Sequence, residues 1–470
     1  MAVGVKRHEP AGEGRIVVAT RERRAAVSLV LLGLALAIPY VLIGPGLVLD
    51  DWWLLRNRHF EGVLATAPSS ETVPRPGAWI VFTLTYGVIG AHPLALYLVQ
   101  AILNVAVTVM LFRTARRFLP LGVSFAVAAV WAVLPNHASL DHWAGTMNVV
   151  VALLLLLLGI QLIGRDDRSA GRRTGVAAVV CLVASVLTYE VTVFAAMTAL
   201  VAVPWLARRG IDRALIIRGG VALVAAAVWV VSNSPKDFGA PIADVALLYP
   251  VHFGQGVAVT WKAGQLLGLV AGIGIGVTLA RLISPSLRPT TGRAERLVVA
   301  GLAVIALGSL AATKTIILVE GVNDRLNVVS STGSAMVWVG LAWQLWRVRA
   351  ARALAVAMSV AFLLVVAPAR IGRDLDYHRA SDDATRLLDD LSRFYPAPDQ
   401  PIAVGPHRLY HHGVLGFIGD FDTSAALQLA RDDPSLEAYW TADEQEFSEA
   451  PTPLRFDAVS RRPAQARPAR

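Results

Sequence analysis

Long apolar runs, separated by short polar segments, dominate the chain. The first run, residues 25–49, contains no charged residue and ends at the pair Asp50–Asp51. Later runs do not show the 3.6-residue stripe of a helix that is half exposed to water. A helix needs about 20 predominantly apolar residues to cross a bilayer. The pattern therefore predicts an all-α polytopic membrane protein.

Two apolar stretches are too long for one crossing. At about 1.5 Å per residue, residues 174–207 would form a helix of about 50 Å, whereas the hydrocarbon core is about 30 Å thick. We expect a hairpin there that turns at residues 188–190. Residues 76–112 break at 90–93, which leaves 78–90 as a helix along the outer surface. About eleven spans are predicted, at residues 25–49, 93–112, 119–134, 144–163, the two halves of 174–207, 214–232, 257–280, 297–312, 332–346 and 353–367.

Lysine and arginine residues orient the predicted spans, because cytoplasmic loops carry an excess of them. In this threading 24 of the 43 Lys and Arg residues fall in cytoplasmic segments and only 7 in outer ones. Residues 1–24 are therefore expected in the cytoplasm, with the first run as a signal anchor. The chain is expected to be a multi-pass protein of the plasma membrane. Its transmembrane module covers residues 25–367, with outer loops at 50–92, 135–143, 233–256 and 313–331.

The C-terminal part of the chain is more polar. Residues 380–394 have the spacing of an amphipathic helix, and residues 401–404 suggest a short strand. Residues 368–450 are therefore expected to form a small extracytoplasmic α/β domain. Residues 451–470 are rich in Pro, Arg and Ala and are predicted to be disordered.

Composition agrees with a membrane protein and excludes several other classes. The chain is 55% hydrophobic and 16% charged, whereas soluble domains have about 25% charged residues. Its net charge of +9 is spread between the spans, as membrane orientation requires, so nucleic acid is not an expected partner. The single cysteine, Cys181, lies within an apolar run, which excludes an intrachain disulfide and a thiolate metal cluster.

Acidic residues gather on the predicted outer side, while the helix centres are nearly free of charge. A transporter would be expected to bury charges near the middle of the membrane. The distribution favours a reaction or recognition event at the outer face. A lipid-linked glycan transporter or flippase and a non-catalytic membrane scaffold remain the alternatives. The outer acids are Asp50, Asp51, Glu61, Glu71, Asp141, Glu190, Asp237, Asp244, Glu320 and Asp324.

The pair Asp50–Asp51 has two interpretations. It can simply end the first span, with Trp52 and Trp53 at the membrane interface, or it can be a functional site. ATP and nucleotide sugars are not available at the outer face, so an enzyme there needs a lipid-borne donor. A lipid phosphate donor requires a carboxylate that deprotonates the acceptor hydroxyl and basic groups that hold the phosphate. The candidate bases are Asp50 and Asp51, and the candidate phosphate partners are Arg75, Lys262, Lys314, Arg325, His137 and His142.

Several short motifs resemble the GT-C glycosyltransferases over about residues 25–345. The acidic pair after the first span, Arg75-Pro76 before a surface helix, and His92-Pro93 at the next span follow the order of that family. Residues 134–145 are similar to the Pro-x-His…Ala-x-x-Gly-Arg loop of the O-mannosyltransferase branch, with Thr146 in place of the Arg. Residues 188–190 resemble its Lys-Glu hairpin with Tyr in place of Lys, and residues 323–327 its Glu-Arg-Tyr loop.

The resemblance implies a polytopic enzyme that moves a hexose or pentose, with inversion, from a polyprenyl-phosphate donor at the outer face. It implies Asp50 or Asp51 as the base, with Asp50 favoured because the family's base is usually the first acid of its pair. It implies Arg75 and Arg325 as phosphate or loop anchors and His137 and Glu190 as supporting residues. The acceptor would be a glycan, a lipid or a protein. No cofactor is expected; we expect no metal, with a divalent ion as the alternative.

Overall fold

A computed structural model describes most of the chain. The described residues are 11–66, 74–164, 171–206, 213–233, 272–278, 292–311, 322–394, 402–405, 410–411, 414–417, 420–440, 453–457 and 462–464. Most of the predicted span 257–280, the loop 233–256 and residues 313–321 lie outside these ranges, and so do Lys262, Lys314 and Glu320.

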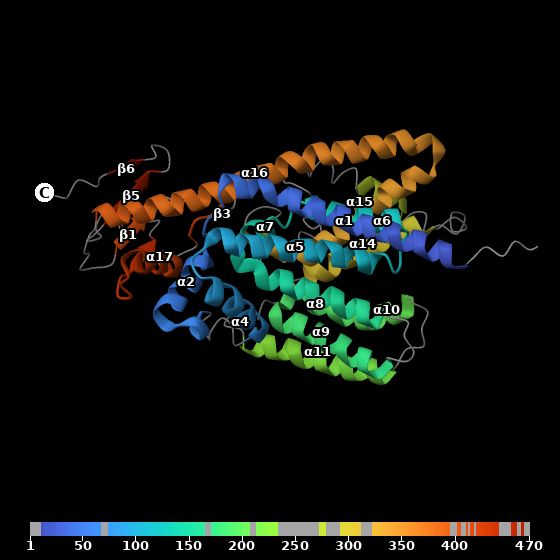
Figure 1. Cartoon of the computed structure of the whole chain (residues 1–470), viewed down its shortest axis with the longest axis horizontal. Helices are drawn as coiled ribbons and strands as arrows, with labels where there is room; N and C mark the ends of the chain where they lie inside the picture. The colour runs from blue at the N-terminus through green and yellow to red at the C-terminus, as the bar shows by residue number, and fades with distance from the viewer. Residues whose placement is uncertain are drawn as a thin grey trace, which may run out of the picture.

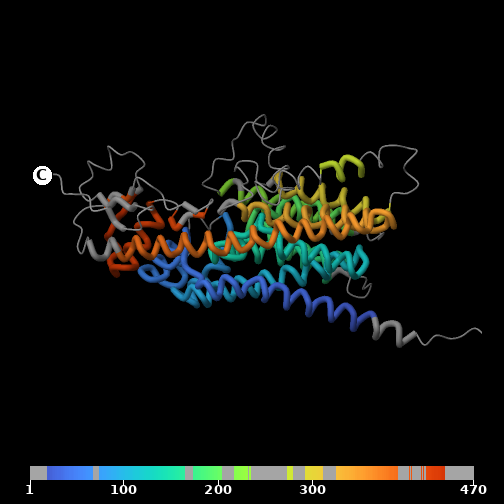
Figure 2. The backbone as a smooth tube through the Cα atoms, turned by 90° about the horizontal axis from the view of Figure 1, so that it is seen from above, coloured from blue at the N-terminus to red at the C-terminus, as the bar shows by residue number. Residues whose placement is uncertain are grey.

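Long helices run side by side along the longest axis of the molecule (Figures 1 and 2). The α-helices are α1 (Ala11–Ile43), α2 (Asp50–Glu61), α4 (Pro76–Phe82), α5 (Pro93–Ala115), α6 (Leu121–Val133), α7 (Ser139–His142), α8 (Met147–Ile163), α9 (Gly171–Thr188), α10 (Val193–Leu206), α11 (Arg213–Asn233), α14 (Arg293–Ala311), α15 (Val328–Arg347), α16 (Arg352–Phe394) and α17 (Asp420–Arg431). Short 3-10 or π segments are η1 (Val63–Ala65), η2 (Thr83–Gly87), η3 (Ala144–Thr146), η5 (Glu190–Thr192), η7 (Val322–Asn327) and η8 (Arg349–Ala351).

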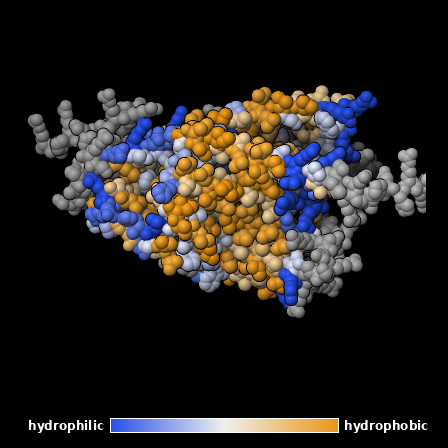
Figure 3. Space-filling model, in the orientation of Figure 1, coloured by the Kyte–Doolittle hydropathy of each residue, from blue (hydrophilic) through white to orange (hydrophobic). Residues whose placement is uncertain are grey.

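An apolar band crosses the middle of the surface, with hydrophilic side chains towards both ends (Figure 3). Within the described residues, four helices are long and apolar enough to cross a membrane: Val18–Ile43, Pro93–Ala115, Ala144–Ile163 and Arg349–Asp389. Shorter apolar helices lie beside them. The chain is therefore a largely helical membrane protein.

Proline and glycine punctuation sets several helix boundaries. Pro76 and Pro93 each occupy the first turn of their helices, where no backbone N–H is needed. Gly90 has a φ of 74°, which lets the chain turn between η2 and α5. The helices α9 and α10 meet at η5, so the hairpin expected at residues 188–190 is present.

Close backbone packing joins α14 to α15. A Cβ atom at Gly333 would lie 2.4 Å from the carbonyl oxygen of Gly301, so only glycine fits at this crossing. Small residues at helix interfaces are the usual means of bringing membrane helices together. The buried apolar core extends from here through α5, α6, α8, α9 and α10.

The helix α16 crosses the boundary predicted at residue 367. It continues through Pro368 to Phe394, so the last predicted span and the amphipathic helix expected at 380–394 are one element. The missing N–H of a proline removes one helical hydrogen bond and can kink a helix without ending it. A division between residues 367 and 368 therefore does not correspond to a break in the structure.

A small sheet lies beyond α16. Strands β1 (Ile402–Gly405), β4 (Ala438–Trp440), β5 (Pro453–Asp457) and β6 (Arg462–Ala464) follow the order β4-β1-β5-β6, with β1 parallel to β4 and β5. The strands β2 (Tyr410–His411) and β3 (Val414–Leu415) pair separately. Within residues 451–470, for which composition predicts disorder, β5 pairs with β1 and β6 pairs with β5. Such pairing satisfies backbone groups and leaves no mark on composition.

Candidate functional site

Asp51 joins three segments that are distant in the sequence. Its side chain is 1% exposed and accepts hydrogen bonds from the Tyr86 hydroxyl, the Val48 N–H (3.0 Å) and the Gly145 N–H (3.0 Å). Burial raises the pKa of the Asp51 carboxyl to about 7, and the hydrogen bond from Tyr86 opposes that rise. Asp51 therefore ties the start of α2 to η2 and to the loop before α8.

The two acids of the pair lie on different faces of α2. Residues three, four or seven apart share a helix face, so Asp51 lies in line with Leu55 and Arg58. Arg58 donates to the carbonyl of Gly87 at 2.9 Å, so this face contacts the helical bundle. Asp50 is half-buried and precedes Trp53 by three residues. Asp50 is therefore the acid on the more accessible side of α2.

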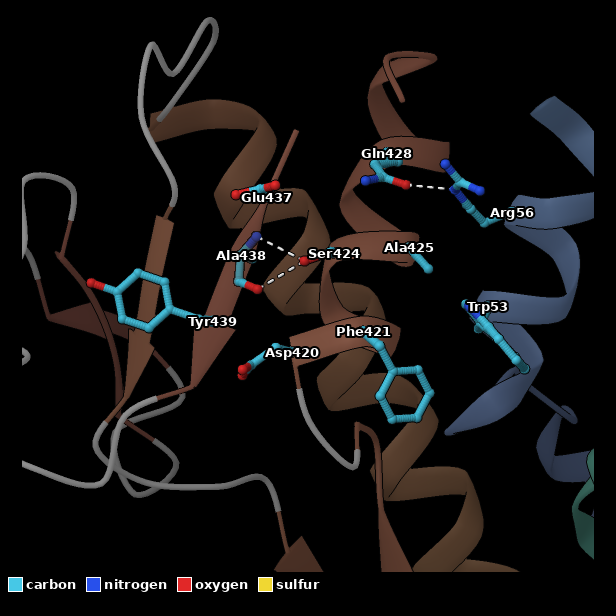
Figure 4. Close-up of a pocket in the computed structure, with 10 residues that line it drawn as sticks. All are labelled: Trp53, Arg56, Asp420, Phe421, Ser424, Ala425, Gln428, Glu437, Ala438 and Tyr439. Carbon is cyan, nitrogen blue, oxygen red and sulfur yellow. Dashed lines mark hydrogen bonds between the residues drawn. The ribbon is translucent and has the colours of Figure 1, made fainter. Parts of the chain in front are cut away.

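A hollow of about 570 Å³ lies between α2 and the C-terminal part of the chain (Figure 4). Trp53 and Arg56 border it from α2, and the Arg56 Nε donates to the side chain of Gln428 on α17 at 2.7 Å. Trp53 stands edge-to-face with Phe421, with 5.9 Å between ring centroids. The hollow thus combines aromatic surfaces with hydrogen-bonding groups on the side of α2 that carries Trp53.

The loop between α6 and α8 is tied to α16 by two charged contacts. His142 binds the Asp374 carboxylate through Nε2, and its Nδ1 lies 2.7 Å from the Ala138 carbonyl oxygen. Both ring nitrogens therefore lie next to oxygen acceptors. Asp141 accepts from Arg370 at 2.5 Å. Such buried pairs are costly to break, because one partner is left as an uncompensated charge.

The same loop contacts η7 and the start of α15. Asp324 accepts the N–H of Ser139 at 3.0 Å, and burial raises the pKa of its carboxyl to about 7. Asn327 donates to the Asn136 carbonyl at 3.0 Å. Residues 136–146 and 322–327, which include two of the segments with GT-C-like motifs, therefore form one polar cluster.

Two residues predicted for the site, Arg325 and His137, lie against aromatic rings of this cluster. The Arg325 guanidinium lies 4.9 Å from the centre of the Trp143 ring. Trp143 is 1% exposed, so its ring lies inside the protein. His137 stacks on Trp131 with ring centroids 4.7 Å apart, and burial lowers the pKa of His137 to about 4. Near neutral pH His137 is an uncharged hydrogen-bonding group.

Arg75 and Glu190 form an ion pair across 115 residues of sequence. Arg75 also lies over the ring of Tyr189, at 5.1 Å from its centre. Tyr189 occupies the position of the Lys in the Lys-Glu hairpin that residues 188–190 resemble. In this chain the positive charge next to that position belongs to Arg75. The two residues predicted separately as a phosphate anchor and a supporting acid are thus direct partners. Lys314 lies outside the described residues.

Three charged residues in or next to this cluster were not predicted from the sequence. Arg370, Arg373 and Asp374 were assigned to the C-terminal domain because they follow an apolar run. Their spacing of three and four residues places them on one helix face, and that spacing was the available signal. Among the described residues, no group of three or more His, Cys, Asp and Glu side chains is arranged to hold a metal ion.

Comparisons with known proteins give low-identity structural matches. No protein-family model and no curated protein matches the sequence. Arabinofuranosyltransferase AftD from Mycobacteria matches with a TM-score of 0.44 and 16% identity, over 90% of this chain and 32% of that chain. The archaeal oligosaccharyltransferase AglB from Archaeoglobus fulgidus, in complex with an inhibitory peptide and a dolichol-phosphate, matches with a TM-score of 0.43 and 14% identity, over 87% of this chain and 64% of that chain. ArnT from Cupriavidus metallidurans, bound to undecaprenyl phosphate, matches with a TM-score of 0.39 and 15% identity, over 90% and 86% of the two chains.

The chain thus spans about a third of the AftD chain and under two thirds of the AglB chain. The three TM-scores are all below 0.5, so these matches assign no role to residues of this chain.

Proposed function

We propose that the protein is a membrane glycosyltransferase that moves a sugar from a polyprenyl-phosphate donor to an acceptor hydroxyl. One observation carries the proposal: the acidic pair and two of the GT-C-like loops meet at the end of the molecule that holds α2. Asp51 contacts Gly145, and Ser139 contacts Asp324 over 185 residues of sequence. Segments that only terminated spans or capped turns would not need to share a buried polar cluster.

Asp50 is the general base in this proposal, and Asp51 positions it. The Asp51 carboxylate already accepts three hydrogen bonds from the protein and is almost completely buried, which leaves no route for an acceptor hydroxyl. Asp50 is half-buried on the face next to Trp53. A base must come within hydrogen-bond reach of the proton that it removes, and Asp50 meets that requirement better.

The transfer is a single displacement. Asp50 takes the proton of the acceptor hydroxyl while the acceptor oxygen bonds to the anomeric carbon. The bond from that carbon to the phosphate oxygen breaks, and the polyprenyl monophosphate leaves with the electron pair, so the configuration inverts. The Arg325 guanidinium stabilises the phosphate as its charge develops, and the Arg75–Glu190 pair holds the surface helix against the hairpin. The proposed reaction requires no metal ion.

The hollow between α2 and α17 provides room for the acceptor. Sugars present flat apolar faces and many hydroxyl groups, and the hollow offers Trp53 and Phe421 beside Arg56 and Gln428. This part of the molecule is extracytoplasmic in the proposed topology of eleven spans with a cytoplasmic N-terminus.

Reconstituted protein is the test system. Polyprenyl-phosphate sugars with a label in the sugar are incubated with membrane glycan, glycolipid and protein fractions, with and without EDTA. Asp50→Asn should reduce transfer by about 10²–10⁴-fold while the protein remains folded. Asp389→Asn is the matched control, because Asp389 is an exposed acid on α16, and it should retain full activity.

Three outcomes would refute parts of the proposal. Transfer that survives in Asp50→Asn, Asp51→Asn and the double variant would exclude the pair as the base. Movement of intact lipid-linked sugar across vesicles, without bond cleavage, would identify a flippase instead. Loss of transfer in EDTA with recovery on adding a divalent metal would show that the metal-free scheme is wrong.

A further inference from the structure

A second hollow lies at the end of the molecule that holds the N-terminal half of α1, away from the α2 end. It has a volume of about 720 Å³ and lies between α1 and α5. Its residues are Glu22, Arg23, Ala26, Val27, Val30, Val109, Phe112, Arg113, Arg116 and Arg117. Four arginines and one glutamate give this lining a net charge of +3 beside a wall of five apolar side chains. The proposed transfer reaction does not use any of these residues.

The arginines converge because of how the two helices are arranged. The helices α1 and α5 run side by side in opposite directions, so the start of α1 meets the end of α5. Arg113 and Arg116 are three residues apart and therefore share a face at that end. Arg116 pairs with Glu22 on α1 at 2.8 Å, which fixes one side of the hollow.

Two of the four arginines are available for a ligand. Arg23 and Arg113 are both exposed, and neither has an ion-pair partner among the residues that the structure describes. Arginines at the cytoplasmic end of a membrane helix are common, so their presence alone is no site. Here they border a hollow that is also lined by apolar residues of the same two helices, among them Val27, which is 50% exposed.

We propose that this hollow binds one anionic phospholipid. Guanidinium groups bind phosphate through paired N–H donors, and basic pockets between membrane helices on the cytoplasmic side take anionic headgroups. The apolar wall formed by Val27, Val30 and Val109 would contact the acyl chains. In the proposed topology this end faces the cytoplasmic leaflet, where anionic lipids concentrate. The lipid joins α1 to α5 at the end opposite the acidic pair.

Native mass spectrometry of the full chain in detergent tests the proposal. The protein is titrated with phosphatidylglycerol and, separately, with phosphatidylcholine of the same chain length. One phosphatidylglycerol should bind in preference to phosphatidylcholine. The double variant Arg23→Gln/Arg113→Gln should weaken that binding about 25-fold, from about fivefold per arginine.

The matched control is Arg21→Gln/Arg24→Gln, which removes the same charge from exposed positions of α1 that do not line the hollow. It should bind phosphatidylglycerol as the unchanged protein does. Equal weakening in both double variants, or equal binding of the two lipids, would overturn the site. Competition by glycerol phosphate at the same concentration would show that the hollow takes a free phosphate and not a lipid. Transfer activity is not part of this readout.

Discussion

Two buried carboxyl groups should make the fold less stable as the pH rises. The pKa values of Asp51 and Asp324 are each about 7 in the folded protein, against 3.8 for a free Asp carboxyl. The folded state therefore binds more protons than the unfolded state between about pH 4 and pH 7. Stability is greatest below the unfolded pKa and is lost as the pH rises through 7. Between about pH 5 and about pH 8, ionisation of each group should lower the free energy of unfolding by about 2.5 kcal/mol.

His137 acts in the opposite direction over part of this range. Its folded pKa of about 4 lies below the 6.5 of a free imidazole, so its contribution is present above pH 6.5 and is lost as the pH falls through 4. A single comparison of the unchanged protein at two pH values would mix these effects. Because His137 is common to all variants, its contribution cancels when variants are compared with the parent.

The informative variants are Asp324→Asn and Asp51→Asn. The Asp324 Oδ2 has no hydrogen-bond partner among the described residues, so the neutral amide loses no bond there and removes the cost of ionisation. Asp324→Asn should therefore stabilise the protein at about pH 8 and have little effect at about pH 5. Asp51→Asn should also gain stability at about pH 8 relative to about pH 5. Its amide nitrogen, however, would face the Val48 N–H, and this loss of a hydrogen bond costs about 1–3 kcal/mol at every pH.

Thermal unfolding in non-ionic detergent, followed by tryptophan fluorescence, measures the difference. For each variant, Tm relative to the parent should be higher at about pH 8 than at about pH 5, and the double variant should show about twice the change. Asp389→Asn, an exposed acid, should follow the parent at both pH values. If Tm relative to the parent does not change with pH in either variant, the two carboxyl groups are not held with raised pKa values, and the reasoning from burial fails.

Three further predictions concern packing and ion pairs, each measured as Tm in detergent. Arg75→Gln and Glu190→Gln should each destabilise the protein, and the double variant should cost about 1 kcal/mol less than their sum; strict additivity would show that the pair contributes nothing. Asp374→Ala should cost about 3 kcal/mol or more, because it leaves a buried histidine without its carboxylate, and a Tm equal to that of the parent would contradict the buried pair. Gly333→Ala should cost about 1–3 kcal/mol by forcing α14 from α15, whereas Gly220→Ala, with no atom within 4 Å of the added Cβ, should not lower Tm.

Helix ends could be predicted where the thickness of the bilayer limits the length of a helix. The turn near Glu190 followed from the rise of a helix and the thickness of a bilayer, and η5 separates α9 from α10 there. The break before Pro93 followed from glycine and proline chemistry. The strand near Ile402 was also expected, but its parallel partners were not, since pairing between distant strands leaves no local signal.

The residues of the candidate site were easier to predict from the sequence than the contacts between them. Asp51 and Arg75 were selected from the sequence, yet the partners of each, Gly145 and Glu190, follow only from tertiary packing. Hydropathy placed Arg370 outside the membrane module because charge normally marks the end of a span. A charged face that turns towards other helices can instead be satisfied by partners such as Asp141.

The continuity of α16 changes how the C-terminal part can be tested. A division at residue 367 suggests a truncation after Pro368, with loss of function as evidence for a scaffold. The removed residues, however, include Arg370 and Asp374, which hold the loop of Asp141 and His142. Such a truncation would disrupt the polar cluster whatever the C-terminal part does. A truncation after residue 394 keeps these pairs, so only that variant can separate a role of the sheet and α17 from the integrity of the candidate site.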